Sequence, residues 1–293
     1  MGVTKWVSEA PERVRERVNR GVRRAVGLTQ EPPEACTDSA EAYLPVDGLA
    51  RLVHGDLTSM MIGGLGSLFF EMLHPHTMAG VAEHSRYQND ALGRVLQTAN
   101  FIGATTYGSC SSALHAIERV RAIHEGVRGV TDNGEPYYAN DPHLLSWVHC
   151  AGTSMFLASY QRFGPERLSR ADADTYVREV ATTARDLGAE NPPTSQDELR
   201  QALDAFRPEL RLSEDARVAR DFVARGVVEG PHQRAAYRLL VNNAYSLLEP
   251  WARDLLGVST APALERTILR PTTRVLASAL RRAIPPTTRL RSA

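Results

Sequence analysis

The sequence has almost no lysine and little cysteine. Lys5 is the only lysine among 293 residues, so the core has no Schiff-base lysine and no lysine for a phosphate-binding P-loop. The three cysteines, Cys36, Cys110 and Cys150, form no CxxC or CxxCH motif, which excludes a cysteine zinc site, a thioredoxin motif and covalently attached haem. They could form one disulfide at most, and a reducing compartment is the simpler interpretation.

An excess of charge is also absent. The formal net charge is zero, so a nucleic-acid-binding protein is not indicated. The N-terminal region has no apolar signal segment, and the most apolar stretch, residues 57–73, contains three glycines, two serines and Glu71. That composition favours a buried core helix over a membrane span. We therefore expect a cytoplasmic protein, with contact at a membrane surface as an alternative.

Helical periodicity dominates the middle of the chain, whereas the alternation typical of strands is rare. Asn133 and Gly134 predict a turn, with a small hairpin around it. The sequence therefore predicts an all-α class, as a single multi-helix domain. The expected helices are 56–73, 87–107, 109–130, 141–163, 170–187, 195–205, 213–226 and 231–256.

Several of these helices have recognisable starts. Asp56 is a candidate N-cap for the first, and Asn140 or Asp141 precedes Pro142 at the start of another. The segment TSQDEL at 194–199 resembles a capping box, in which a serine is followed three residues later by a glutamate.

The two ends of the chain differ in composition from the middle. Residues 1–42 read as a leader with a short basic amphipathic helix at 10–28, and residues 259–293 as an arginine-rich tail. The tail has seven arginines and no acid between Arg266 and Arg291. We expect a solvated leader helix and a partly ordered surface tail, with an anionic partner or membrane surface as the alternative. The expected domain spans residues 43–258.

His124 stands where an apolar side chain would be expected. In the segment VRAIHEGVRG at 120–129 it continues a helical stripe that includes Leu114, Ile117, Val120 and Val127. A buried imidazole without a partner costs roughly 1–3 kcal/mol. A carbonyl, a carboxylate, a water molecule or a metal should therefore satisfy it.

Eight of the nine histidines lie between residues 54 and 149. The HPH segment suggests a metal pair formed by His74 and His76, with His84 and Asp56 as further ligands. Pro75 between the two histidines predicts a bend that turns their side chains apart. A bend held by polar hydrogen bonds is therefore favoured over a metal site. His149 follows an aromatic helix entrance and is interpreted as a core or pocket-lining residue.

Arg94 and Thr98 lie four residues apart and share one face of a predicted helix. Beside apolar residues, they could hold a small polar or anionic group in a dry pocket. From the residues alone, an exposed Arg94 paired with Asp90 is the favoured interpretation.

Three segments together resemble the MpaB/latex-clearing rubber-oxygenase family. They are FFEMLHPHTMAGVAEHSRYQNDALGRVLQTANF at 69–101, VRAIHEGVRG at 120–129 and YYANDPHLLSWVH at 137–149. The resemblance covers roughly residues 45 to 255 and rests on several motifs in the same order. It implies an all-helical fold with a globin-like core, non-covalent haem b, and oxidation of apolar, often isoprenoid, substrates by oxygen.

The resemblance also implies roles for single residues. His124 matches the family's proximal haem ligand, and Arg94 and Thr98 match its distal arginine and threonine. Gln97 stands where the rubber-cleaving branch has a lysine that can bind the iron. Lysine ligation is therefore excluded, and the MpaB-like and uncharacterised bacterial branch fits better than rubber cleavage.

Two arginines flank the expected iron ligand. We expect Arg121 and Arg128 to pair with haem propionates, because both are charged at all pH values. Glu83 is a candidate for a catalytic carboxylate.

The sequence thus predicts a haem-b-dependent oxygenase or oxidoreductase that uses oxygen or a peroxide and a small hydrophobic substrate. One alternative is a non-catalytic haem-binding or gas-sensing protein with the same ligand. A second is a non-haem metal-dependent hydrolase built on Asp56, His74, His76 and His84.

Overall fold

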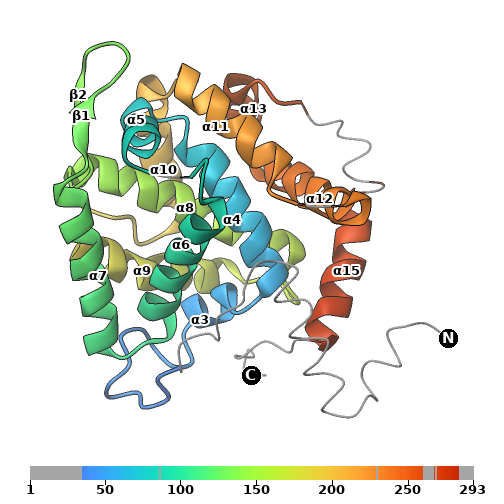
Figure 1. Cartoon of the computed structure of the whole chain (residues 1–293). Helices are drawn as coiled ribbons and strands as arrows, with labels where there is room; N and C mark the ends of the chain where they lie inside the picture. The colour runs from blue at the N-terminus through green and yellow to red at the C-terminus, as the bar shows by residue number, and fades with distance from the viewer. Residues whose placement is uncertain (1–34, 86, 229, 260–266, 268, 284–293) are drawn as a thin grey trace.

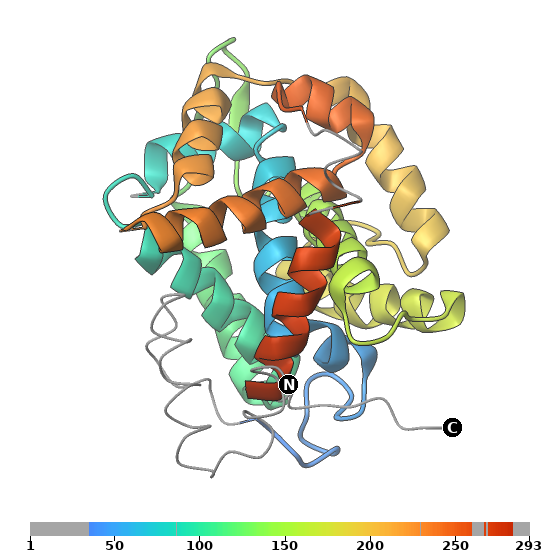
Figure 2. The ribbon, with the colours of Figure 1, turned by 90° about the vertical axis from the view of Figure 1, so that its right-hand side faces the viewer.

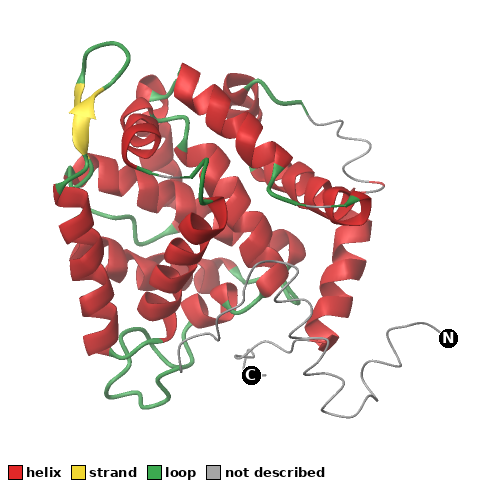
Figure 3. Cartoon of the chain, viewed as in Figure 1, coloured by secondary structure: helices red, strands yellow, loops and turns green. Residues whose placement is uncertain are grey.

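The computed structural model describes residues 35–85, 87–228, 230–259, 267 and 269–283. Within these ranges regular structure is almost entirely helical, which confirms the all-α class (Figures 1 and 3). The helix expected at 10–28 lies outside the described residues. Among the described helices, none combines the length and the apolarity that crossing a bilayer requires.

Two long helices form the centre of the molecule. They are α4 (Leu57–Glu71) and α8 (Pro142–Phe163), which pack along one another. Asp56 caps α4 by accepting a hydrogen bond from the Ser59 amide at 2.9 Å, and Asp141 caps α8 by accepting from the His143 amide at 2.8 Å. The Asp56 cap was predicted from the sequence, and Asp141 was one of the two residues predicted for the other cap. Apolar side chains of both helices are fully buried in the core, among them Ile62, Phe69, Trp147 and Ala151.

Gly63 allows the close approach of these two helices. A Cβ atom at this position would lie 2.9 Å from a ring carbon of Phe156 and 3.2 Å from the Met155 carbonyl. At Gly64 the nearest atom, at 3.9 Å, is at ordinary van der Waals distance. The two neighbouring glycines therefore differ in how much space they have.

We expect Gly63→Ala to destabilise the protein by about 1–3 kcal/mol, because the added methyl group overpacks the contact between α4 and α8. Gly64→Ala is the matched control. It removes a helix-interior glycine without a clash and is expected to stabilise by roughly 0.5–1 kcal/mol. Urea unfolding of both variants measures the difference, and equal stabilities would contradict the packing argument.

The other helices surround this pair. Those that pack on α8 or beside it are α3 (Leu49–His54), α9 (Arg170–Leu187) and α10 (Gln196–Phe206), followed by a short 3₁₀ turn, η1 (Arg207–Glu209). The helices of the C-terminal half are α11 (Glu214–Arg225), α12 (Pro231–Leu247), α13 (Pro250–Leu256) and α15 (Arg270–Ala283). Figure 2 shows α12 and α15 across the face of α4, and both contact it.

A small hairpin projects beyond the helices (Figure 3). It consists of β1 (Arg128–Val130) and β2 (Pro136–Tyr138), with Arg128 opposite Tyr138. Gly134 has a φ of 88°, in the left-handed region that glycine adopts without strain. The predicted turn at Asn133 and Gly134 is therefore confirmed.

Several elements differ from the sequence predictions, and the helix expected at 87–107 begins only at Ala91. The HPH segment does not form a simple bend, because His74 and Pro75 begin helix α5 (Pro75–His84). The helix expected at 109–130 ends at Glu125, since its last three residues form strand β1 instead. The helix expected at 231–256 divides into α12 and α13 at Pro250, where a proline starts a new helix more easily than it continues one.

The expected capping box at 194–199 is only half formed. The Ser195 hydroxyl accepts a hydrogen bond from the Glu198 amide at 3.3 Å, as predicted. The Glu198 carboxylate, however, accepts from the amide and hydroxyl of Thr194 rather than from the Ser195 amide. The complete box occurs at α9, between Ser169 and Asp172.

Candidate functional site

The predicted site residues lie on two consecutive helices, α6 (Ala91–Tyr107) and α7 (Cys110–Glu125). A short turn joins them, and in Figure 1 they lie side by side near this turn and diverge away from it. Arg94 and Thr98 belong to the first half of α6, and His124 belongs to the last turn of α7. All three therefore lie toward the diverging ends of the two helices.

His124 lies on the side of α7 that packs inward. Ile117, two turns earlier on the same stripe, is buried, and Val120 and His124 are half-buried. The Nδ1 atom of His124 is inaccessible to solvent. Leu114 departs from the expected stripe, because its side chain is 44% exposed.

Thr98 is less enclosed than expected. Thr98 is exposed at its position on α6, and the Arg94 side chain lies outside the described residues. Val95 beside Arg94 is 51% exposed, and Ile123 beside His124 is 62% exposed. Large apolar side chains thus remain open to solvent next to the predicted site residues.

Arg128 of the hairpin and Asn140 just after it hold the last turn of α7, and sequence patterns did not predict these contacts. The Arg128 guanidinium donates to the Glu125 carbonyl at 2.6 and 3.2 Å and lies 5.4 Å from the Tyr138 ring centroid. The Asn140 amide donates to the Arg121 carbonyl and to the Glu125 carboxylate, each at 3.0 Å. Arg128 therefore fixes the helix end that carries His124. Its role toward a propionate, and that of exposed Arg121, stay predictions.

Glu83 lies under the same hairpin. Its carboxylate accepts a hydrogen bond from the Tyr137 hydroxyl at 2.5 Å and lies 3.8 Å from Nε2 of His84. A Cβ atom at Gly129 would lie 2.6 Å from this carboxylate, so a larger residue there would displace the Glu83 side chain. These contacts tie α5 to the hairpin, and they assign Glu83 no catalytic function.

The histidines of the HPH segment lie against carboxylates rather than forming a metal centre. His74 caps α5 through Nδ1, and its Nε2 lies 3.4 Å from Glu209, which also contacts His143 at 2.9 Å. His76 contacts a different carboxylate, that of Glu135, at 3.2 Å. Over the described ranges, no group of three histidine, cysteine or acidic side chains is arranged to hold a metal.

The remaining predicted metal ligands are also engaged elsewhere. Asp56 is buried at the start of α4, where Arg281 of α15 donates to it, and His84 contacts Glu83. The structure therefore does not bring Asp56, His74, His76 and His84 together, and it gives no support to the hydrolase alternative.

His149 is confirmed as an interior residue of α8. Its Nδ1 lies 3.4 Å from the Thr153 hydroxyl, and its Nε2 is buried without a hydrogen-bond partner among the described residues. Burial lowers the pKa of His149 to about 4, and the positive charge of Arg185 contributes a smaller part. The imidazole is therefore neutral at pH 7.

This depressed pKa predicts a loss of stability in mild acid. Between its unfolded pKa near 6.5 and its folded value near 4, His149 binds a proton in the unfolded chain but not in the folded one. The free energy of unfolding then rises with pH across this window, by up to about 1.4 kcal/mol per pH unit for this group. We expect His149→Leu to make urea-unfolding stability measurably less dependent on pH between 6.5 and 5. An unchanged slope would contradict the assignment.

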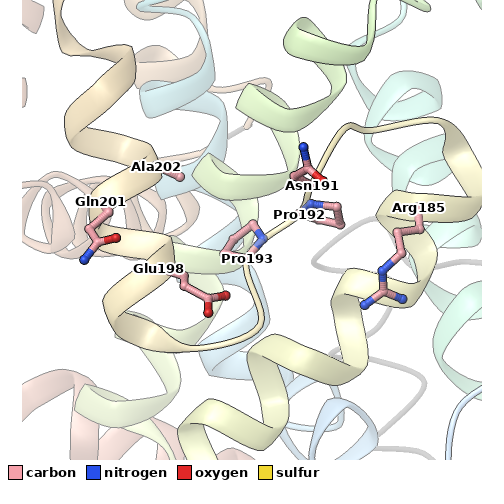
Figure 4. A pocket seen from close by; sticks show the side chains of 7 residues that line it. All are labelled: Arg185, Asn191, Pro192, Pro193, Glu198, Gln201 and Ala202. Atoms are coloured by element: carbon pink, nitrogen blue, oxygen red, sulfur yellow. The ribbon is translucent and has the colours of Figure 1, made fainter.

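A cavity of about 720 Å³ lies away from these helices (Figure 4). It is formed by the end of α9, the start of α10 and the loop between them. Its lining residues are Arg185, Asn191, Pro192, Pro193, Glu198, Gln201 and Ala202. None of them belongs to the predicted site on α6 and α7.

Comparison with known proteins places the chain in a family. A family model described as "ER-bound oxygenase mpaB/B'/Rubber oxygenase, catalytic domain" matches residues 51–282. A solved structure described as "Structure of Latex Clearing Protein LCP in the closed state" aligns with a TM-score of 0.49 and 16% identity, covering 99% of this chain and 87% of that one. The search of curated proteins gave no match.

The matched region extends from helix α3 to the end of α15 and includes both α6 and α7. It thus covers most of the chain and every residue predicted from the motifs to form the site. The chain belongs to the mpaB/rubber oxygenase catalytic-domain family, a family of oxygenases.

Proposed function

We propose that the protein is a haem-b-dependent oxygenase in which the imidazole of His124 binds the iron. The observation that carries the proposal is the position of His124, which interrupts the inward apolar stripe of α7 within a chain of the oxygenase family. The motif resemblance supports haem as the cofactor. The proposed substrate is a small hydrophobic molecule, and the proposed oxidant is oxygen or a peroxide.

The chemistry of the side chains fits a haem. A neutral imidazole is a suitable axial ligand, and the guanidinium of exposed Arg121 suits a propionate. Val95, Leu114 and Ile123 leave apolar surface open on the two helices, and an apolar macrocycle would cover such surface favourably. These observations support the proposal.

Each residue would then have a distinct task, while haem supplies the oxygen chemistry when it is bound. The enclosed Nδ1 of His124 favours binding of iron through Nε2. Arg128 and Asn140 keep the last turn of α7 in place, which orients the imidazole. Arg94 and Thr98 would donate hydrogen bonds to a polar group held beside the bound haem.

The test is an absorption spectrum of the protein produced with a haem supply, combined with a pyridine haemochrome assay. We expect a Soret band and about one haem b per chain, as a single axial histidine implies. Oxygen uptake is then measured with dissolved isoprenoid alkenes and a reductant, and again with peroxide.

The outcomes separate the candidate functions. Absence of a Soret band after haem titration would overturn the proposal. A haem-loaded protein that converts none of the probes would instead be a haem-binding or gas-sensing protein. Cleavage or oxygenation of an alkene probe would support the oxygenase.

A further inference from the structure

The cavity between α9 and α10 opens to solvent, and two exposed side chains of opposite charge lie at its edge. Figure 4 shows the Arg185 guanidinium and the Glu198 carboxylate on opposite sides, with Pro192 and Pro193 between them. Both prolines are buried, so they form a fixed apolar surface. A charged group on each side of an apolar wall is the arrangement that a small bifunctional molecule would match.

The two charges do not neutralise one another. Arg185 forms no ion pair within 4.0 Å and its side chain donates no hydrogen bond to any described residue. One carboxylate oxygen of Glu198 accepts from the amide and hydroxyl of Thr194, at 2.7 and 2.9 Å. Those hydrogen bonds lower the pKa of Glu198, with a smaller effect from Arg178, so it stays ionised. The Arg185 guanidinium and the Glu198 carboxylate therefore both stay charged, and each can form a further hydrogen bond with a ligand.

We propose that this cavity binds a small zwitterion, a molecule with a carboxylate and an ammonium group joined by a short apolar chain. The carboxylate binds the guanidinium of Arg185, and the ammonium binds the carboxylate of Glu198. The apolar chain lies against Pro192 and Pro193. The amides of Asn191 and Gln201, at the edge of the same cavity, supply further polar contacts.

The test compares zwitterions with analogues that carry only one of the two charges. Binding of γ-aminobutyrate and ε-aminocaproate is measured by calorimetry and compared with binding of caproate and hexylammonium at the same ionic strength. We expect at least one zwitterion to bind about tenfold more tightly than either analogue, because each analogue lacks one charged hydrogen bond.

Single substitutions assign the two ends of the ligand. Arg185→Gln is expected to remove the advantage of the zwitterion over hexylammonium, and Glu198→Gln its advantage over caproate. Arg178→Gln controls for a loss of positive charge near the cavity, because Arg178 is an exposed cation of the same helix that acts on Glu198 through its charge but lies outside the cavity lining. Circular dichroism of each variant checks that the fold is kept.

His149 provides a second measurement at Arg185. The charge of Arg185 contributes to the low pKa of this imidazole, so a carboxylate bound to Arg185 is expected to raise that pKa. An NMR titration of the His149 ring, with and without saturating zwitterion, measures the change. Hexylammonium is expected to leave it unchanged.

Three results would overturn the proposal. They are equal affinities for zwitterions and analogues, equal losses in Arg178→Gln and Arg185→Gln, and a His149 pKa that does not respond to bound zwitterion. No haem is needed for these measurements, since no cavity residue belongs to α6 or α7. If the zwitterion proposal fails, the proposed oxygenase function is unaffected. If the oxygenase function fails, the zwitterion proposal is likewise unaffected.

Discussion

His124→Ala is expected to weaken haem binding by more than about 100-fold, because loss of groups that only support a metal ligand already costs 10–100-fold. The purified variant should lack the Soret band of the parent, or show one altered by a different axial ligand. His124 is only half-buried, whereas Ile117 on the same stripe is buried. Replacing His124 by alanine therefore removes less buried contact than replacing Ile117 would. The fold should therefore survive, and circular dichroism and the unfolding midpoint verify this.

His115→Ala is the matched control for this experiment. His115 lies on the same helix, two and a half turns before His124, and is exposed. We expect His115→Ala to keep one haem per chain and the spectrum of the parent. If His124→Ala also kept the full haem content with an unchanged axial-ligand spectrum, His124 would be a structural histidine and the proposed ligation would be wrong.

A third variant separates two effects, namely binding of the iron by the imidazole and positioning of that imidazole by its neighbours. Asn140→Ala removes two hydrogen bonds to the last turn of α7 but leaves the imidazole in the chain. We expect this variant to bind haem with a moderately lower affinity and a less uniform spectrum. Amide hydrogen exchange at the end of α7 should also be faster in the haem-free protein, a change that does not depend on haem or on activity.

The parts of the fold that the sequence predicts are those that depend on near neighbours. Asp56 and Asp141 cap helices that begin one residue later, and Gly134 supplies the conformation that its own turn requires. Helix α5 was missed although its signal is also local. Proline is typical both of a bend and of the first turn of a helix. Here the His74 imidazole caps the helix, which is an unusual N-cap, and this contact favours the helix over the bend.

The candidate site also has some features that local sequence patterns predict and others that they do not. The stripe of α7 that carries His124 is a local pattern, and burial of Ile117 confirms its inward side. The Arg128 and Asn140 contacts depend on how the hairpin folds back on the helix, which no short pattern encodes. The cavity at Arg185 was missed because its two charged side chains come from different helices, and only the folded loop between them sets their separation.

The contact between Arg281 and Asp56 joins two parts of the described chain that are far apart in sequence. The two residues are 225 positions apart, and they join α15 to the N-terminus of α4. Asp56 is 2% exposed, and the Arg281 side chain is also largely buried and donates to the Phe163 carbonyl. A basic tail expected to lie on the surface thus supplies an arginine to the interior.

Removal of this guanidinium is expected to be severely destabilising. Arg281→Ala leaves the Asp56 carboxylate buried without its partner, and breaking a buried ion pair in this way costs about 3–5 kcal/mol. The midpoint of thermal unfolding should fall by roughly 5–15 °C. Arg274→Ala is the control, because Arg274 lies on the same helix, is exposed and donates to the Arg162 carbonyl at 3.3 Å. Loss of that one hydrogen bond should cost no more than about 1 kcal/mol.

A second substitution tests whether the unpaired charge causes the loss. Asp56→Asn keeps an N-cap oxygen for the Ser59 amide but removes the negative charge, so adding it to Arg281→Ala should recover part of the lost stability. In the parent, the same Asp56→Asn change removes one partner of the pair and should destabilise. If the double variant were no more stable than Arg281→Ala alone, the loss would come from contacts of α15 other than this ion pair.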